Sequence, residues 1–199
     1  MGMEGAGTET SITVVSGLPR SGTSMMMAML AAGGVEILTD GVREPDESNP
    51  RGYFEFEPTK ALRDSEAAWL PMAEGKAVKV VSPLLRYLPA QHHYKILFML
   101  RSIDEILASQ GRMLEGTGQE TSAHADAKLA ASFTRHLTEV RNWLADQPNV
   151  EALWIPYRAV IDDPIAAARS ISSFLGQPLD ETAMAQAIDR SLYRERLEP

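Results

Sequence analysis

The residues best suited to chemistry stand in a short segment near the start of the chain, GLPRSGTS. Gly17 and Gly22 bracket four residues there and separate an apolar run from a helix-forming run. Backbone N–H groups of such a turn converge on one point, where the dipole of the following helix favours an anion. The segment predicts a phosphate-binding loop that consists of Gly17, Pro19, Arg20, Ser21, Gly22, Thr23 and Ser24. The alternative is a tight turn that only caps a core helix.

The loop differs from that of nucleoside-triphosphate hydrolases at one important position. Thr23 replaces the lysine of their G-x-x-x-x-G-K-S motif, and the positive charge of this loop is at Arg20 instead. These hydrolases also hold Mg²⁺ with an aspartate at the end of an apolar strand. No strand predicted here ends in aspartate, so the sequence argues against nucleotide hydrolysis. A divergent kinase with this type of loop stays an alternative.

Apolar runs alternate with helical patterns along the chain and would position this loop. Short apolar runs, several rich in β-branched residues, predict strands over residues 11–17, 35–38, 76–81, 94–100 and 150–155. Periodic or capped segments predict helices from the loop to residue 32, over 59–70, from 102, over 121–146, over 164–175 and after 180. Such alternation predicts an α/β fold in which helices cover both faces of a central parallel sheet. Residues 39–58 are predicted to form a long loop.

Composition and charge limit the class of protein. The chain has 199 residues, which suits a single domain over residues 11–199 behind a flexible lead at 1–10. Nineteen Lys and Arg against 27 Asp and Glu give a net charge of −8, which argues against a nucleic-acid partner. The chain contains no cysteine, which excludes disulfides, thiol nucleophiles and zinc–thiolate sites. It shows neither a secretory signal nor a membrane span, so we expect a cytoplasmic protein with no membrane partner.

Two later segments, FMLRSIDEILASQ and WIPYRAVIDDPIAAARSISSFLG, follow the loop in order. Together with GLPRSGTS they resemble the sulfotransferases that use 3′-phosphoadenylyl sulfate (PAPS), over residues 12 to about 178. The resemblance implies a three-layer α/β/α, P-loop NTPase-like fold, PAPS as co-substrate without a metal, and sulfuryl transfer to a hydroxyl or amine. The acceptor would be a small molecule, a carbohydrate or a peptide, and the sequence leaves a homo-oligomer open.

The resemblance also assigns the residues that would bind the nucleotide. The loop would bind the 5′-phosphosulfate, Arg101 and Ser109 would bind the 3′-phosphate, and Tyr157 would contact the adenine. Arg101 follows a predicted strand, and ligands collect at the carboxyl ends of parallel strands in such folds. Alternatively, Arg101 is a surface arginine that pairs with Asp104 or Glu105.

Two cations are candidates for assisting the transfer itself. Arg20 would act from the loop, and Lys79 resembles the lysine that opens the family's strand toward the acceptor site. Charge develops on the departing phosphate, and prearranged donors that strengthen there lower the barrier. Lys79 could equally be a strand-edge lysine that aids solubility.

The base that takes the acceptor's proton is harder to assign. Many family members use a histidine two positions after that lysine, but Val81 occupies the position here. Other branches use a carboxylate soon after the first helix, and the predicted loop offers Asp40, Glu44, Asp46, Glu47, Glu55 and Glu57. We favour Glu55, because its aromatic neighbours Tyr53 and Phe54 would make its carboxylate a stronger base. Asp40 is second, from its distance beyond the first helix, and any of these residues could be a solvated loop charge.

One further family motif is missing. The Gly-x-x-Gly-x-x-Lys segment that closes over the 3′-phosphate has no counterpart, and the tail offers only Arg190, Arg194 and Arg196. Together with the missing histidine, this keeps another class of protein open. Such a protein would bind adenosine 3′,5′-bisphosphate (PAP) or a similar nucleotide without transferring anything.

Overall fold

A five-stranded sheet forms the centre of the protein. The computed structural model describes residues 11–44, 49, 52–64, 66–115 and 123–192. Within these residues the strands run in the order β2-β3-β1-β4-β5, and every neighbouring pair is parallel. Their bounds are β1 Ile12–Gly17, β2 Ile37–Leu38, β3 Ala77–Lys79, β4 Tyr94–Leu100 and β5 Val150–Pro156. β1 is buried along its whole length, which agrees with its central place in the sheet. The lead predicted at 1–10 lies outside the described residues.

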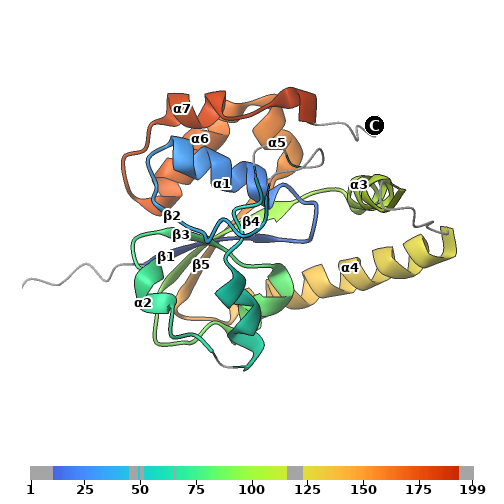
Figure 1. Ribbon diagram of the computed structural model, residues 1–199, viewed down its shortest axis with the longest axis horizontal. Helices are drawn as coiled ribbons and strands as arrows, with labels where there is room; N and C mark the ends of the chain where they lie inside the picture. The colour runs from blue at the N-terminus through green and yellow to red at the C-terminus, as the bar shows by residue number, and fades with distance from the viewer. Residues whose placement is uncertain (1–10, 45–48, 50–51, 65, 116–122, 193–199) are drawn as a thin grey trace, which may run out of the picture.

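Helices cover both faces of the sheet (Figure 1). One layer holds α1 (Thr23–Ala32), α5 (Tyr157–Asp162), α6 (Pro164–Leu175) and α7 (Glu181–Gln186), which leads to the 3₁₀ helix η3 (Arg190–Leu192). The other layer holds α2 (Leu70–Ala73), α4 (Ala123–Ala145) and the 3₁₀ helices η1 (Glu57–Asp64) and η2 (Ser82–Tyr87). α3 (Ile103–Glu115) packs against the part of α4 that projects beyond the sheet. The predicted three-layer, P-loop NTPase-like α/β/α fold is confirmed.

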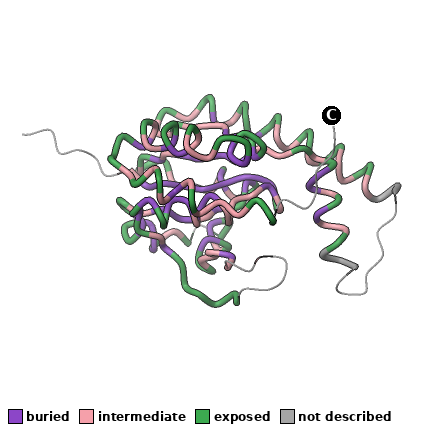
Figure 2. The backbone as a smooth tube through the Cα atoms, turned by 90° about the horizontal axis from the view of Figure 1, so that it is seen from above, coloured by how far each residue is buried: buried purple, intermediate pink, exposed green. Residues whose placement is uncertain are grey.

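Two apolar clusters, one on each face of the sheet, hold the layers together. Successive side chains of a strand point to opposite faces, so Leu97 and Met99 of β4 join one cluster and Ile96 and Phe98 join the other. The buried part of the chain runs through the middle of the molecule, with exposed residues on the outer sides of the helices (Figure 2). The methionine run of α1 belongs to the core, and its fully buried members are Met26, Met27 and Met29.

The helix predicted over residues 59–70 is wrong. The chain forms η1 there, then a turn, and α2 begins only at Leu70. Pro71 stands in the first turn of α2, and a residue without an N–H can start a helix but does not continue one. Trp69 at this junction packs edge-on against Phe56, with ring centroids 5.5 Å apart. The aromatic contact therefore fixes two short helices in place of one long helix.

Two smaller differences concern the ends of strands. β3 ends at Lys79 instead of residue 81, and η2 begins at Ser82 with Pro83 in its first turn. α5 follows β5 directly, and its six residues are too few to give a helical period in the sequence.

No helix in the described part of the chain combines the length and apolarity needed to cross a bilayer.

Candidate active site

The ends of two neighbouring strands bring the predicted loop and Arg101 together. β1 and β4 are paired directly, and Gly17 at the end of β1 is in register with Met99 near the end of β4. The loop that follows β1 and the residues that follow β4 therefore leave the sheet at the same edge. This is the carboxyl edge, where parallel sheets of this kind bind their ligands.

The loop presents hydrogen-bond donors that suit an anion. No side chain caps the N–H groups in the first turn of α1, which Gly22 precedes. The hydroxyl of Ser21 is buried and has no hydrogen-bond partner among the described residues. Because buried polar groups are normally satisfied, these groups fit a phosphosulfate or phosphate group. Arg20 adds a positive charge from a left-handed backbone conformation, with φ of 67°. Of the remaining loop residues, Pro19 is exposed, and Thr23 and Ser24 lie in the first turn of α1.

Two hydrogen bonds join the loop to Arg101, which follows β4, and to Ser109 on α3. The guanidinium Nε of Arg20 donates to the hydroxyl of Ser109 on α3, at 3.0 Å. Arg101 Nη1 donates to the backbone carbonyl of Arg20, at 3.1 Å. Arg20 of the first motif therefore meets Arg101 and Ser109 of the second motif at one point.

Tyr157 closes this part of the site from the side of α5. Its ring lies under the guanidinium of Arg101, 4.5 Å from ring centroid to Cζ. A Cβ atom at Gly22 would lie 2.5 Å from the same ring, so only glycine fits there. Burial raises the pKa of Tyr157, against the opposing effect of the Arg101 charge, and keeps the phenol neutral. The ring contacts the loop and the arginine and is part of the apolar cluster on this face of the sheet, and its contact with adenine stays a prediction.

Lys79 reaches the loop from the neighbouring strand. Its Nζ donates to Ser24 Oγ at 3.0 Å and to the backbone carbonyl of Tyr53 at 2.9 Å. Burial lowers the pKa of Lys79 to about 8; the Glu55 carboxylate opposes this shift, while Arg43 and Arg20 add to it. Lys79 therefore lies inside the site, which argues against the alternative of a solubility lysine at a strand edge.

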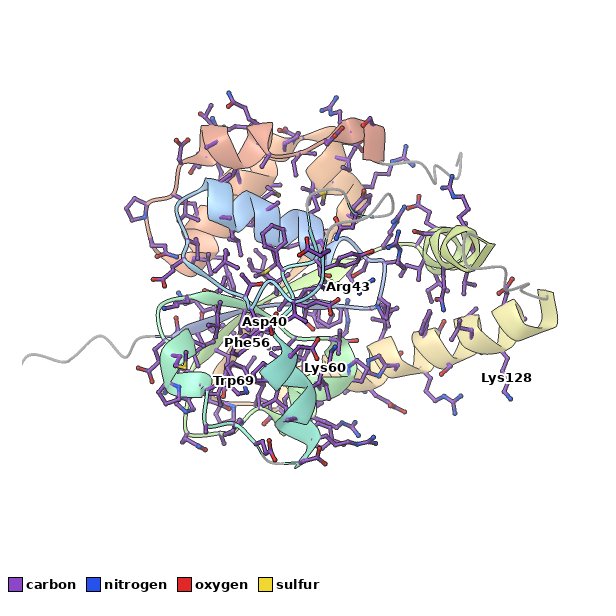
Figure 3. The ribbon with its side chains drawn as sticks, viewed as in Figure 1. Asp40, Arg43, Phe56, Lys60, Trp69 and Lys128 are labelled. Carbon is purple, nitrogen blue, oxygen red and sulfur yellow. The ribbon has the colours of Figure 1, made fainter. Side chains whose placement is uncertain are left out.

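The loop between β2 and η1 carries the predicted base Glu55 and Arg43, and η1 adds Lys60; the sequence analysis missed both cations. Glu55 Oε1 accepts from Arg43 at 2.7 Å, and its Oε2 lies 3.9 Å from Lys60 Nζ. Arg43 also stacks on Tyr53, with its Cζ 3.3 Å from the ring centroid. Figure 3 shows Arg43 on this loop and Lys60 on the following helix η1, both far from Lys128 at the projecting end of α4. The spacing of Arg43, Glu55 and Lys60 has no helical or strand period, so only the folded loop reveals their pairing.

The other predicted carboxylates have different surroundings. Asp40 accepts hydrogen bonds from the backbone N–H groups of Glu57 and Val42, at 2.6 and 3.1 Å. Partial burial raises the pKa of Asp40, but these hydrogen bonds outweigh it and lower the pKa below its ordinary value. Asp40 thus organises the loop. Glu57 pairs with Lys60, and Glu44 is exposed, whereas Asp46 and Glu47 lie outside the described residues.

The arginines of the tail are not gathered at the site by any described contact. Arg190 donates to the backbone carbonyl of Asp162 at 3.2 Å. Arg194 and Arg196 lie outside the described residues. The part of the chain that the structure describes contains no group of three or more His, Asp or Glu placed to hold a metal ion.

The sulfotransferase domain model matches residues 11–196 of the chain. The chain belongs to the sulfotransferase family. It is therefore a transferase, and its reaction is the transfer of a sulfuryl group. A comparison with curated protein sequences found no match.

Solved sulfotransferases have similar folds. STF1 from Mycobacterium tuberculosis H37Rv has a TM-score of 0.61 and 19% identity, over 94% of this chain and 74% of that chain. The sulfotransferase domain of the Synechococcus PCC 7002 olefin synthase has a TM-score of 0.56 and 18% identity, over 95% of this chain and 89% of that chain. Mouse SULT7A1, solved in complex with PAP, has a TM-score of 0.56 and 14% identity, over 89% of this chain and 62% of that chain.

Proposed function

We propose that this sulfotransferase moves the sulfuryl group of PAPS to a hydroxyl or amine, without a metal. The observation that carries the proposal is the pair of hydrogen bonds that joins the opening loop to Arg101 and Ser109. Because the two donor clusters adjoin, one nucleotide with phosphates at both ends of its ribose can reach both. The PAP bound to the structurally similar mouse sulfotransferase supports the same choice of nucleotide.

The residues divide between the two phosphates of the nucleotide. The N–H groups of the loop, with the Ser21 hydroxyl and Arg20, hold the 5′ end. Arg101 and Ser109 hold the 3′-phosphate, and Tyr157 supports the arginine from beneath. When bound, PAPS supplies the sulfuryl group and leaves as PAP.

Arg20 and Lys79 stabilise the charge that grows on the departing phosphate. Both lie beside the first turn of α1, and Lys79 already holds the Ser24 hydroxyl at 3.0 Å. Donors arranged before the reaction need little reorganisation as charge develops, which is the main source of rate in such sites. With a pKa of about 8, Lys79 is mostly charged at neutral pH.

Glu55 takes the proton of the acceptor in this proposal. Its negative charge opposes the lowering of the Lys79 pKa by burial, so the carboxylate acts on the side of the site where Lys79 lies. Arg43 holds Oε1, whereas Lys60 Nζ lies 3.9 Å from Oε2, beyond hydrogen-bond distance. We therefore assign the proton to Oε2. The acceptor, a small molecule, carbohydrate or peptide, binds over the loop that carries Glu55.

Calorimetry followed by a transfer assay tests the proposal. PAP should bind without a metal, and Arg20→Ala should weaken binding by about tenfold or more, the usual loss for a charged hydrogen bond. ³⁵S-labelled PAPS with a library of hydroxyl and amine acceptors should then give a labelled product. Tight PAP binding without turnover on any acceptor would indicate a nucleotide-binding protein. Mg²⁺-dependent binding of ATP in place of PAP would indicate a kinase and contradict the proposal.

A further inference from the structure

Glu105 is a buried carboxylate that the proposed reaction does not use. It stands in the first turn of α3, and its Oε2 accepts a hydrogen bond from Arg101 Nε at 2.9 Å. The side chains of both residues are only 8% exposed. The pair is therefore buried beside the site, and not the surface pair that the sequence left open.

Stability alone gives a weak reason for this arrangement. A buried ion pair loses the hydration of two charges, and apolar residues of similar volume often stabilise a protein as well or better. The N-terminus of α3 does favour negative charge, but Asp104 supplies one in the same turn while remaining exposed. The burial of a second carboxylate at this position calls for another explanation.

The explanation lies in the contacts of the arginine that Glu105 holds. Glu105 binds Nε, the backbone carbonyl of Arg20 binds Nη1 at 3.1 Å, and the ring of Tyr157 lies against the guanidinium face. The two hydrogen bonds lie in the guanidinium plane, and the ring restricts rotation out of it. The three partners come from α3, the loop and α5, so the plane is fixed with respect to the whole nucleotide side of the site.

We propose that Glu105 is a positioning residue, which orients Arg101 and thereby sets the preference for nucleotides that carry a 3′-phosphate. The inference rests on the proposed function, because it takes Arg101 as a ligand of that phosphate. A carboxylate repels a phosphate, so Glu105 acts through the arginine and not by contact. Its contribution is to remove in advance the rotamer freedom that an arginine loses when it binds a ligand.

The test compares two nucleotides that differ only at the 3′ position. Calorimetry gives the dissociation constants of PAP and 5′-AMP for the wild type, Glu105→Ala and Glu105→Gln. We expect Glu105→Ala to lower the preference for PAP over 5′-AMP by about tenfold, and to leave 5′-AMP binding within about threefold. Glu105→Gln keeps an oxygen acceptor for Nε and should retain most of the preference. If Glu105→Ala does not fold, Glu105→Met fills a similar volume and replaces it.

Asp104→Ala is the matched control, since it removes the same charge from the same helical turn without touching Arg101, and it should keep the wild-type preference. Arg101→Ala distinguishes a failure of the 3′-phosphate site from a failure of the positioning role. If Arg101→Ala leaves the preference unchanged, the proposed 3′-phosphate site is wrong. If Arg101→Ala abolishes the preference but Glu105→Ala and Glu105→Met keep it within about threefold, only the positioning role is overturned. In the Arg101→Ala background, Glu105→Ala should have no further effect on the preference.

Discussion

The nucleotide side and the acceptor side of the site differ in how their charges are held. On the nucleotide side, Arg101 and Glu105 have side chains that are 8% exposed and tied to two other segments. On the acceptor side, the side chains of Arg43 and Lys60 are 44% and 61% exposed, and both pair with Glu55. Solvent screens exposed pairs, so they contribute about 0–1 kcal/mol each, whereas buried groups hold a fixed geometry.

This difference in exposure means that the charges of one half are held in a fixed geometry, whereas those of the other half can change partners. On the proposed nucleotide side, buried contacts hold Arg101 in one geometry without a ligand, which would suit a co-substrate whose two phosphates have fixed positions. The acceptor side can exchange its weak ion pairs for contacts with the acceptor at little cost. Lys79 stands between the two halves, bonded to Ser24 on one and to the carbonyl of Tyr53 on the other.

The largest effect should come from a methyl group at Gly22. Its φ of 100° and the Tyr157 ring at 2.5 Å leave no space for a Cβ atom. We expect Gly22→Ala to lower the free energy of unfolding by about 3 kcal/mol and to weaken PAP binding by about a hundredfold or more. Urea unfolding and calorimetry measure the two effects.

Gly41→Ala is the matched control on the acceptor side. Gly41 also has a positive φ, 66°, but nothing lies within 4 Å of the position of its Cβ atom. Gly41→Ala should lower the free energy of unfolding by about 1 kcal/mol through backbone strain and leave PAP binding unchanged. Equal losses for the two variants would mean that the nucleotide side is no more rigid than the acceptor side.

Glu55→Gln should separate binding from turnover. Loss of a general base commonly lowers the rate by about 10²–10⁴-fold, and the amide cannot take the acceptor's proton. We expect kcat to fall within this range while PAP affinity stays unchanged, because Glu55 lies on the acceptor side. Steady-state kinetics and calorimetry with the same preparation give both values.

Glu57→Gln is the neighbouring control. It also removes a partner of Lys60 but leaves the Arg43–Glu55 pair in place, so its kcat should stay near that of the wild type. Unchanged turnover in Glu55→Gln would remove Glu55 as the base and direct attention to Asp40→Asn.

The pH dependence of transfer should report the charge on Lys79. Burial lowers the pKa of Lys79 to about 8, so the positive charge is lost as the pH rises through that value. With a hydroxyl acceptor, kcat/KM for PAPS should fall above about pH 8, approaching tenfold per pH unit. Lys79→Arg stays charged throughout this range and should move the fall to higher pH. An identical profile for wild type and Lys79→Arg would show that another group causes the fall.

The smallest effect is expected outside both halves, at the contact between η2 and α4. Ser82 Oγ and His136 Nε2 are 2.9 Å apart there. Burial lowers the pKa of His136, with Glu139 opposing and Arg86 adding to the shift, so the folded protein binds this proton less readily than the unfolded chain. Neutral His136 therefore contributes to the free energy of unfolding. This contribution is fully present above pH 6.5, the ordinary pKa of histidine, and is lost as the pH falls through the lowered pKa of His136.

Urea unfolding across this pH range measures the effect. His136→Gln removes the titrating group and should lose less stability on acidification than the wild type, while PAP affinity stays the same in both. An equal loss in the two proteins would show that His136 does not contribute to the acid sensitivity.

Local signals predicted the strands and helices around the loop because each of them is a short contiguous segment. Strand 94–100 was readable from its apolar run, and the helix over 164–175 from its ends, where Asp163 accepts from the N–H of Ala166 at 3.0 Å and Gly176 adopts φ of 71°. The loop motif likewise needs only its own eight residues and the helix after it.

The acceptor side could not be predicted in the same way. The pairing of Glu55 with Arg43, 12 residues earlier, depends on how an irregular loop folds back on itself. The packing of Trp69 on Phe56, which divides the predicted helix, is equally non-local. The burial of Glu105 was missed for a related reason, since the spacing to Arg101 gives the pair but not its depth.

A structure of the complex with PAP tests the central claim most directly. We expect one phosphate against the N–H groups of the loop at residues 17–24 and the other against Arg101 and Ser109, with a single nucleotide joining them. PAP bound elsewhere, or with only one phosphate at this edge of the sheet, would contradict it.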